Sequence, residues 1–287
     1  MKLFSHINIF RQLSMSFVGL WFVCFAVLPI ILMVVISFMT PSTNGLVVWH
    51  FTVNNYVQLA NDIFFRIFIH SFEFSLSCTI ITLLLAYPAA YFISESNKRI
   101  KPLLLMFIIM PFWTSSLIRT YAMMALVKTK GIINTVLLAL GIIHQPLLML
   151  YTNMAMLIGF SYNLLPFMIL PLYSNFEKLD YRIFDAARDL GASRWRIFRS
   201  ITLPLTLPGI IVGVLFVFLP AMTLFYIPDL LGGARGILLG NLVKEQFLVM
   251  NDWPGGAATS TVLTCVLLIM LACYRSRVGR SQLQELV

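Results

Sequence analysis

Three charged residues lie within or at the edge of stretches that are otherwise apolar: Glu73, Arg119 and Asp229. A charge at the centre of a lipid bilayer costs at least about 2.5–3.5 kcal/mol on insertion scales. Charged residues in such positions therefore usually face a cavity or pair with one another. These three residues are the first candidates for chemistry in this sequence.

The residues near Asp229 favour a cation as the ligand. Phe225 and Tyr226 precede it closely in the sequence, and Trp113 stands in an earlier apolar stretch. A carboxylate can neutralise an ammonium group, and the faces of aromatic rings attract cations. We therefore interpret Asp229, Tyr226, Phe225 and Trp113, with Glu73 as a further carboxylate, as the candidate lining of a cation path.

Arg119 favours a different role, because a guanidinium repels a cationic solute. It can pair with Asp229 or with Glu73 and so hold two helices together or lock a gate. This pairing is also the structural alternative for the two carboxylates, and the sequence leaves both interpretations open.

Residue patterns typical of enzymes are missing from the sequence. It contains no G-x-x-x-x-G-K-[ST] loop for ATP phosphates, no H-E-x-x-H zinc motif and no nucleophile elbow. The cysteines have no metal-like spacing and the histidines are scattered singly, so we expect no disulfide framework, no redox motif and no metal site. These residues are Cys24, Cys78, Cys265 and Cys273, and His6, His50, His70 and His144.

A dense block of charge interrupts the second half of the chain. It holds six charged residues within fifteen positions: Asp185, Arg188, Asp189, Arg194, Arg196 and Arg199. The local pattern predicts a helix, a glycine turn and a second helix. Asp180 and Ser193 can cap the two helices, and Gly191 suits the left-handed residue between them. Pro204 and Pro208 are expected to stop the second helix.

Two small residues in this block, Ala186 and Ala187, let another surface approach closely, while the charges around them keep the unit in water. We interpret the block as a docking element for a soluble cytoplasmic partner. A solvated connector is the alternative. A DNA-binding helix-turn-helix is discounted, because short connections tie both ends of the block to the membrane.

Composition identifies the elements that must position these residues. The chain is 60% hydrophobic and 11% charged, with a mean hydropathy of +0.90, whereas soluble domains have about 25% charged residues. A membrane-spanning helix needs roughly 20 apolar residues. We expect residues 1–287 to form one all-α transmembrane domain with six spans, at 17–39, 67–93, 102–127, 147–173, 208–231 and 257–274. The first span is too long for a signal peptide and is interpreted as a retained anchor.

The distribution of lysine and arginine predicts the orientation. The amino end, the segments after spans two and four, and the tail hold 14 of the 20 basic residues. The positive-inside rule therefore places both termini in the cytoplasm, and the charged block, within residues 177–204, becomes the longest cytoplasmic loop. The net charge of +9 thus reflects topology rather than affinity for nucleic acid. On the opposite side, residues 238–247 predict a short amphipathic helix, which either contacts a binding protein or packs on the chain itself.

The charged loop resembles a known motif. ABC importer permeases carry E-A-A-x-x-x-G followed by I-x-L-P between two late spans, and this chain has Asp185-Ala186-Ala187, Gly191, Ile201 and Leu203-Pro204. Asp185 replaces the family's glutamate, which keeps the charge and shortens the side chain by one methylene. The resemblance implies a six-helix permease of the type I, MetI-like kind. In that family the loop is a coupling helix that seats in a cleft on the ATPase, which assigns Asp185, Ala186, Ala187, Gly191 and Arg194 to coupling.

Four longer segments resemble the permeases of polyamine importers: PFWTSSLIRTYA, LLPFMILPLYSNFEKLD, LFYIPDLLGGA and VKEQFLVMNDWPGGAATS. The resemblance implies a bacterial inner-membrane subunit for spermidine and putrescine that holds no cofactor and is not itself an enzyme. It also implies four kinds of partner: a homologous second permease, an ATPase dimer that binds ATP and Mg²⁺, a periplasmic polyamine-binding protein and membrane lipid. Alternatives are a permease for ferric iron or an organophosphonate, and a self-sufficient secondary transporter or membrane enzyme. A secondary transporter would be expected to show inverted repeats with broken helices, and we identify none in the sequence.

Overall fold

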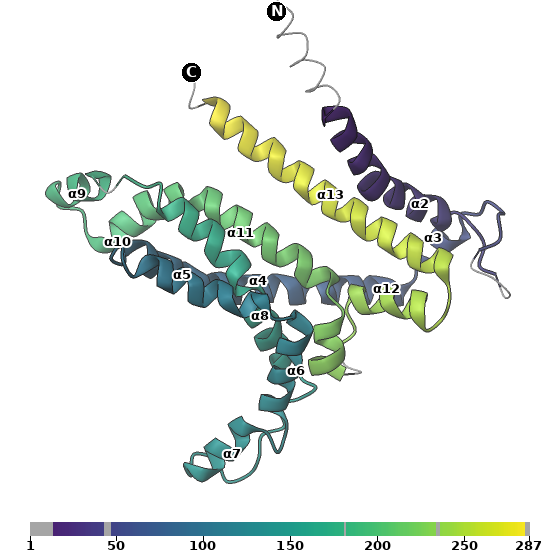
Figure 1. The fold of residues 1–287 in the computed structure, drawn as a ribbon, viewed down its shortest axis with the longest axis horizontal. Helices are drawn as coiled ribbons and strands as arrows, with labels where there is room; N and C mark the ends of the chain where they lie inside the picture. The colour runs from purple at the N-terminus through teal and green to yellow at the C-terminus, as the bar shows by residue number, and fades with distance from the viewer. Residues whose placement is uncertain (1–13, 43–46, 181, 234–235, 285–287) are drawn as a thin grey trace, which may run out of the picture. The chain divides into compact units, whose positions relative to one another are not determined.

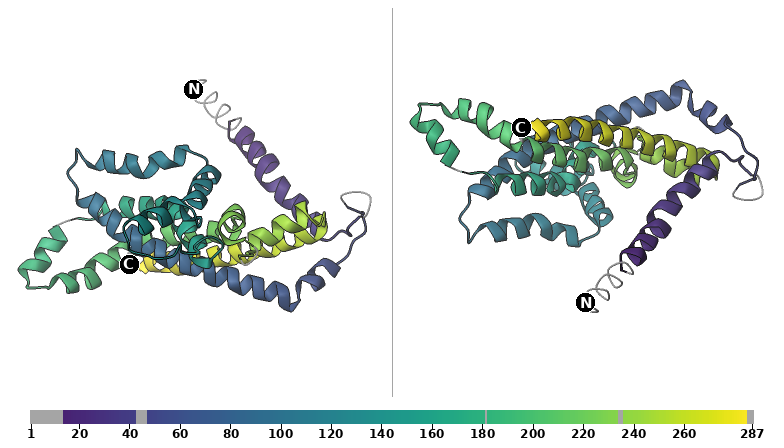
Figure 2. Two further views of the ribbon diagram at one scale, coloured as in Figure 1. Left: turned by 90° about the horizontal axis from the view of Figure 1, so that it is seen from below. Right: turned by 90° about the horizontal axis from the view of Figure 1, so that it is seen from above.

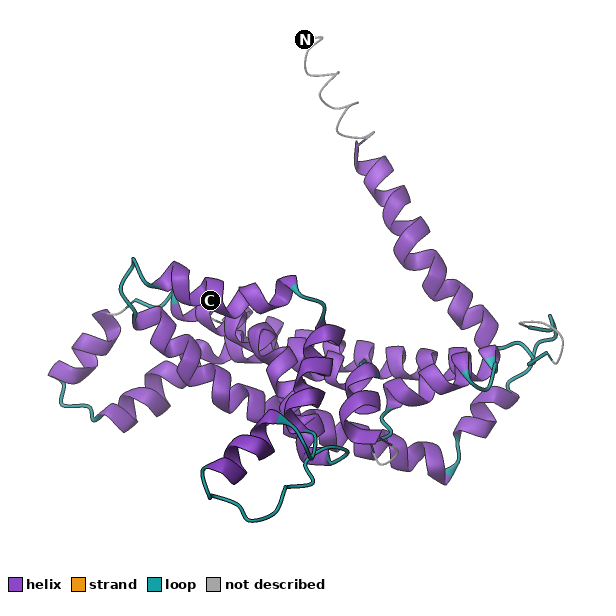
Figure 3. Ribbon diagram, turned by 60° about the horizontal axis from the view of Figure 1, so that its bottom comes forward, coloured by secondary structure: helices purple, strands orange, loops and turns teal. Residues whose placement is uncertain are grey.

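The computed structural model describes residues 14–42, 47–180, 182–233 and 236–284. In these ranges the regular structure is helical, with one isolated antiparallel bridge between Thr40 and Val48 (Figure 3). The chain divides into two compact units. The first comprises residues 1–65 and 242–287, and the second comprises residues 66–241. Each unit is described by itself.

Six helices in the described ranges are long and apolar enough to cross a membrane, which confirms the predicted number. They are Ser14–Ser37, Asp62–Glu95, Ser116–Ala139, Asn153–Phe176, Arg194–Thr223 and Trp253–Ala272. Lys101–Trp113 is a shorter apolar helix. The all-α fold follows from this composition, because a helix satisfies its backbone hydrogen bonds within one segment and so suits a lipid environment.

The first unit packs its helices around α13 (Trp253–Gln284). The amino-terminal helix contains a π-helical turn, η1 (Val23–Val27), followed by α2 (Leu28–Ser37), and α2 lies along α13. The short helix α3 (Asn54–Leu59) also contacts α13. Asn55 is buried, and its Nδ2 donates to the carbonyl oxygens of Ser37 and Met39, both at 2.8 Å. These bonds fix α3 to the end of α2.

The second unit has its core along α8 (Asn153–Phe176) and α11 (Leu203–Thr223), which pack against each other (Figure 1). Gly209 and Gly213 provide the close approach. A Cβ at Gly209 would lie 2.7 Å from Cβ of Asn175, and a Cβ at Gly213 would lie 2.5 Å from Sδ of Met168. The G-x-x-x-G step therefore serves a contact within the chain. The long helix α4 (Asp62–Glu95) contributes Phe74, Cys78, Ala86 and Ala90 to the same core.

The predicted third span, residues 102–127, is divided in the structure. It consists of α5 (Lys101–Ile109), the 3₁₀ turn η2 (Met110–Trp113) and α6 (Ser116–Val127). Between η2 and α6, Thr114 has an extended backbone with φ −90° and ψ 146°. Pro111 favours this break, because it has no N–H to donate to the preceding turn. A short helix, α7 (Ile132–Ala139), follows α6.

The predicted fifth span, residues 208–231, also differs from the structure. Helix α11 ends at Thr223, and Leu224 is extended with φ −67° and ψ 128°. The π-helical turn η4 (Pro228–Gly232) comes next, so Asp229 lies in this separate turn. The helix α12 (Leu239–Leu248) follows and confirms the predicted helix near residues 238–247.

The expectation that Pro204 and Pro208 stop the helix after the charged block is wrong. The helix from Arg194 to Thr223 is continuous. It changes to a π-helical turn, η3 (Phe198–Thr202), directly before α11, and Pro204 occupies the first turn of α11. Within a continuous helix, a local π adjustment of this kind accommodates the N–H that proline lacks. Pro208 lies inside the helix, as proline often does in membrane helices.

Candidate functional site

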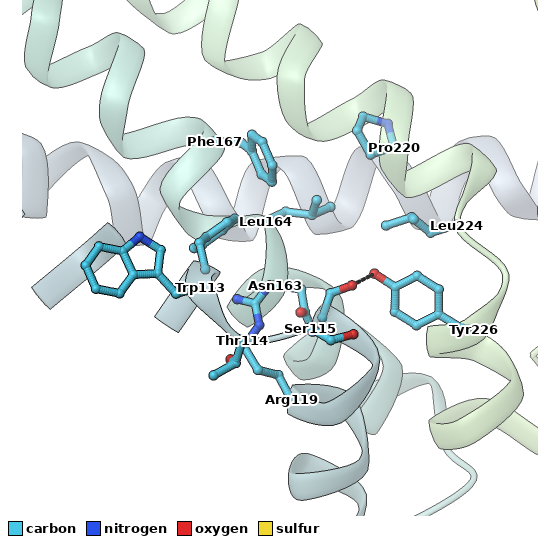
Figure 4. A pocket seen from close by; sticks show the side chains of 12 residues that line it. Trp113, Thr114, Ser115, Arg119, Asn163, Leu164, Phe167, Pro220, Leu224 and Tyr226 are labelled. Atoms are coloured by element: carbon cyan, nitrogen blue, oxygen red, sulfur yellow. Dashed lines mark hydrogen bonds between the residues drawn. The ribbon is translucent and has the colours of Figure 1, made fainter. Parts of the chain in front are cut away.

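A cavity of about 540 Å³ lies where the two broken spans of the second unit meet α8 (Figure 4). Trp113 and Tyr226 stand on opposite sides of it, with Arg119 and Asn163 between them (Figure 4). Its lining is mixed, with aromatic, hydroxyl, amide and guanidinium groups. The lining residues are Phe112, Trp113, Thr114, Ser115, Ser116, Arg119, Asn163, Leu164, Phe167, Pro220, Leu224 and Tyr226.

One local hydrogen bond closes the first helix break, and a second bond joins the two breaks. The Thr114 hydroxyl donates to the carbonyl oxygen of Pro111 at 2.7 Å, which closes the end of η2. Across the cavity, the Tyr226 hydroxyl donates to Oγ of Ser116 at 2.9 Å. This second bond joins the first turn of α6 to the segment after α11. The two breaks therefore form one connected wall.

Arg119 is the charged residue of this cavity, and it is only 9% exposed. Its guanidinium carbon lies 4.4 Å from the centroid of the Phe112 ring, in a cation–π contact. Its Nε is buried and has no hydrogen-bond partner among the described residues. The pairing with Asp229 or Glu73 that the sequence suggested is not present, since Arg119 forms no ion pair within the described part of the chain.

Asn163 provides the second polar group of the cavity that lacks a complete set of partners. Its Nδ2 donates to the carbonyl oxygen of Gly159 at 2.9 Å and to Oγ1 of Thr120 at 3.4 Å. Its Oδ1 is buried without a hydrogen bond to any described residue. Buried polar atoms are normally satisfied, and the exceptions often mark functional positions.

The structure brings together only part of the predicted cation path. Trp113 and Tyr226 line the cavity of Arg119, and Trp113 is 82% exposed on this chain. Phe225 does not line the cavity, but its ring packs edge-on against Tyr226 with the centroids 6.1 Å apart. Glu73 is exposed on α4 and lines neither this cavity nor the one that contains Asp229.

Asp229 lies in a different cavity of about 670 Å³. The residues that line this cavity with it are Leu148, Leu150, Tyr151, Thr152, Gly232 and Gly233. Nδ2 of Asn241, a buried residue, donates to Oδ1 of Asp229 at 2.5 Å and to the carbonyl oxygen of Phe225 at 3.0 Å. Asn241 therefore orients the Asp229 carboxylate and ties η4 to the start of α12.

The charged loop forms two helices, as predicted. Helix α9 (Arg182–Asp189) and helix α10 (Arg194–Ile197) extend from the ends of α8 and α11 (Figures 1 and 2). Oδ1 of Asp180 accepts from the backbone N–H of Arg182 at 3.0 Å, and Oγ of Ser193 accepts from that of Arg196 at 3.4 Å. Gly191 has a φ of +76°. The predicted caps and the left-handed glycine are confirmed.

The loop presents apolar side chains on its surface. Leu190 is 88% exposed and Trp195 is 69% exposed, whereas Phe184 is buried and anchors α9. The side chains of Asp185 and Arg188 form an exposed ion pair at 2.9 Å. Ala186 is exposed and Ala187 is half-buried. A loop that holds large apolar groups in the open has a surface suited to a protein partner.

Sequence reasoning missed several residues of these surfaces. In the cavity these are Phe112, Ser116 and Asn163. On the loop they are Leu190 and Trp195. Asn163 offered a signal, because an amide within an apolar span needs a partner or a cavity. The two helix breaks gave weaker signals, since proline also occurs in continuous membrane helices.

Comparisons with known proteins agree with these features. Residues 82–276 match the family described as "Binding-protein-dependent transport system inner membrane component". The chain is 47% identical over 254 residues to the spermidine/putrescine transport system permease protein PotB of Escherichia coli (strain K12), covering 88% of this chain and 92% of that one. It is 43% identical over 267 residues to PotB of Haemophilus influenzae, covering 93% of each chain.

Two solved structures share the fold. One is a bacterial ABC transporter involved in the import of the acidic polysaccharide alginate, with a TM-score of 0.70 over 96% of this chain and 99% of that chain. The other is the bacterial alginate transporter in complex with its pentasaccharide-bound periplasmic protein, with a TM-score of 0.72 over 96% and 98%. Both are 17% identical to this chain, so they establish its architecture alone.

Proposed function

Because the chain belongs to the family of binding-protein-dependent transport system inner membrane components, we propose that it is a permease subunit of an ATP-driven importer for polyamines such as spermidine and putrescine. The observation that supports polyamines as the substrate is the sequence identity of 43–47% to spermidine/putrescine permeases over 88–93% of the chain. No comparison favours ferric iron, an organophosphonate or a secondary transporter.

The complex that this function requires contains several partners. A homologous second permease forms the other half of the pathway, and a dimer of ATPase subunits binds ATP and Mg²⁺ in the cytoplasm. A periplasmic polyamine-binding protein delivers the substrate. The chain itself then acts as one permease domain without an ATPase site. Its basic loops support an orientation with both termini in the cytoplasm, so reporter fusions at the tail and after Thr40 should report from opposite sides of the membrane.

For the substrate route, we assign Trp113 and Tyr226 as aromatic walls and Asp229 as the carboxylate that attracts the cation. Trp113 lies at a helix break with most of its ring exposed, which suits contact with a passing ammonium group. Asp229 is exposed on this chain, and Asn241 orients it. Phe225 supports the Tyr226 ring. Glu73 is assigned to the same route only because it is a carboxylate in a membrane-spanning helix.

For energy coupling, we assign the α9–α10 loop as the element that docks on the ATPase. Asp185, Ala186, Ala187, Gly191 and Arg194 carry the resemblance to the family motif. The exposed Leu190 adds an anchor, because fully burying a leucine stabilises an interface by about 1.5–3 kcal/mol. The two neighbouring alanines leave room for the partner surface to approach.

Uptake by the reconstituted complex tests the substrate. This chain, the second permease, the ATPase and the binding protein are placed in proteoliposomes, and the entry of labelled spermidine and putrescine is measured with and without ATP. We expect ATP-dependent uptake that an excess of unlabelled polyamine suppresses and that ferric iron or an organophosphonate does not. Uptake of either competitor in place of polyamines would contradict the proposal.

A pair of glycine variants tests coupling. Gly191 has φ +76° and Gly141 has φ +67°, and an added Cβ would meet no atom within 4 Å at either position. Gly191→Val and Gly141→Val therefore impose similar backbone strain in similarly open space. We expect Gly191→Val to reduce ATPase co-purification and uptake, while Gly141→Val retains both. Equal behaviour of the two variants would remove the assignment of Gly191 to the docking surface.

A further inference from the structure

The cavity beside Arg119 carries a positive charge that no lining residue neutralises. Arg119 is the one residue of the described lining with a formal charge, and this lining contains no carboxylate. The amino end of α6 opens into the same cavity, and the Ser115 side chain makes no capping hydrogen bond there. A helix amino end carries partial positive charge. The cavity is therefore suited to a negatively charged group.

Arg119 is held in position without being neutralised. The Phe112 ring lies under its guanidinium, and its buried Nε has no hydrogen-bond partner among the described residues. Buried charges in proteins are normally paired and hydrogen-bonded. A carboxylate matches this requirement closely, because its two oxygens can accept parallel hydrogen bonds from one guanidinium.

The predicted topology, with Lys101 at the cytoplasmic surface, places the break that forms this cavity at membrane depth. A helix over Lys101–Trp113 rises about 18–20 Å, whereas the hydrocarbon core is about 30 Å thick. Thr114 and Ser115, which follow, have non-helical backbones and are exposed on this chain. Irregular backbone at this depth is tolerated only where protein or a water-filled cavity covers it. A second permease that packs on this face would cover the break and close the cavity against lipid.

We propose that an aspartate or glutamate of the second permease enters this cavity and pairs with Arg119 while no substrate is bound. The inference rests on the proposed function, because it takes the second permease as the chain that covers the break. A polyamine carries ammonium groups and no carboxylate, so it does not supply the missing charge. Its ammonium groups compete with Arg119 for the partner's carboxylate. The pair is thus a gate that a polyvalent cation releases.

Charge exchange in the reconstituted complex tests the pairing. Arg119→Glu places a carboxylate opposite a carboxylate, and we expect it to abolish polyamine uptake. Each aspartate and glutamate in the spans of the second permease is then changed to arginine and combined with Arg119→Glu. Restoration of uptake at one position is the expected result, and that partner variant alone should also be inactive.

Cross-linking provides a second measurement that does not depend on transport. Cys24, Cys78, Cys265 and Cys273 are first replaced by serine, and Arg119→Cys is combined with cysteine at each acidic position of the second permease. A short thiol cross-linker should join one pair in the substrate-free complex, and spermidine with the binding protein should suppress the product. Ile118→Cys is the matched control, because neighbouring helical residues point about 100° apart. It should not cross-link to the same position.

The outcomes separate the alternatives. If no acidic position restores uptake and none cross-links to residue 119, the pair does not exist. A free anion in the cavity would give a different set of results. Chloride or phosphate would then alter the ATPase rate of the wild-type complex, Arg119→Gln would remove that effect, and no charge exchange would restore uptake. These three results together would overturn the proposal. Failure of the proposed function looks different, because the wild-type complex would then not take up polyamines, whatever the cross-link shows.

Discussion

The two cavities of the second unit are similar in size and opposite in charge. The Arg119 cavity, of about 540 Å³, holds a buried guanidinium and the amino end of α6. The Asp229 cavity, of about 670 Å³, holds an exposed carboxylate that Asn241 orients. On this chain alone, the charged residue of the first cavity repels a cation and that of the second attracts one. The same unit therefore offers one site that needs an anion and one that suits a cation.

This difference shows that the aromatic residue and the carboxylate lie in separate cavities although they are close in sequence. Tyr226 and Asp229 are three residues apart, a spacing that in a regular α-helix puts two side chains on one face. Here both residues follow the extended Leu224 and lie in one short helical segment, in which the N–H of Asp229 donates to the carbonyl oxygen of Phe225 at 3.2 Å. Tyr226 nevertheless lines the Arg119 cavity and Asp229 the other.

The largest expected effect follows from neutralising the second cavity. Asp229→Asn keeps the shape of the side chain and removes its charge. A hydrogen bond to a charged group contributes about 1.5–3 kcal/mol, so we expect kcat/KM for spermidine uptake to fall about 10- to 100-fold. Assembly of the complex should be unchanged, because Asp229 is exposed on this chain. Initial uptake rates in proteoliposomes measure the effect.

Asp252→Asn is the matched control. Oδ1 of Asp252 accepts from the backbone N–H of Gly255 at 2.9 Å, and asparagine caps a helix as well as aspartate does, so uptake should persist.

A double variant tests whether the two cavities are independent. Because Arg119 and Asp229 line different cavities, Arg119→Gln should not restore the Asp229→Asn variant. Restoration would mean that the two residues neutralise each other, as the structural alternative from the sequence held.

A smaller effect is expected from the aromatic wall of the first cavity. Trp113→Leu removes a ring that can contact an ammonium group, and such contacts contribute about 0.5–1 kcal/mol at exposed sites. We expect the KM for spermidine to rise about 2- to 5-fold. Trp49→Leu is the matched control, because Trp49 is 81% exposed and Trp113 is 82% exposed, and Trp49 lines neither cavity. Equal effects of the two changes would remove Trp113 from the route.

The sequence predicted those parts of the molecule whose physics is local. The caps at Asp180 and Ser193 and the left-handed Gly191 depend on a few neighbouring residues, and all three were predicted. The helical spans follow from apolar composition in the same way. The helix at 239–248 followed from its periodicity.

What the sequence did not predict depends on contacts between distant segments. The breaks at Thr114 and Leu224 lie in apolar runs whose composition equally suits a continuous helix. The continuity of the helix through Pro204 depends on the π-helical turn before it. The orphaned Nε of Arg119 and Oδ1 of Asn163 became visible only when three separate segments met around one cavity.

The smallest expected effect concerns the hydrogen bond that joins the two helix breaks. Tyr226→Phe removes the hydroxyl that donates to Oγ of Ser116 at 2.9 Å. Hydrogen bonds between membrane helices contribute about 0.6 kcal/mol on average, so the free energy of unfolding in detergent should fall by about that amount. Ser116→Ala should cost about the same, and the double variant little more, because both changes remove one bond. Tyr151→Phe in the other cavity is the control, since the Tyr151 hydroxyl has no hydrogen-bond partner among the described residues and that cavity should lose no stability. If the losses in the free energy of unfolding from Tyr226→Phe and Ser116→Ala are additive, the bond does not join the two breaks in solution. The first cavity would then lack the connected wall that distinguishes it from the second.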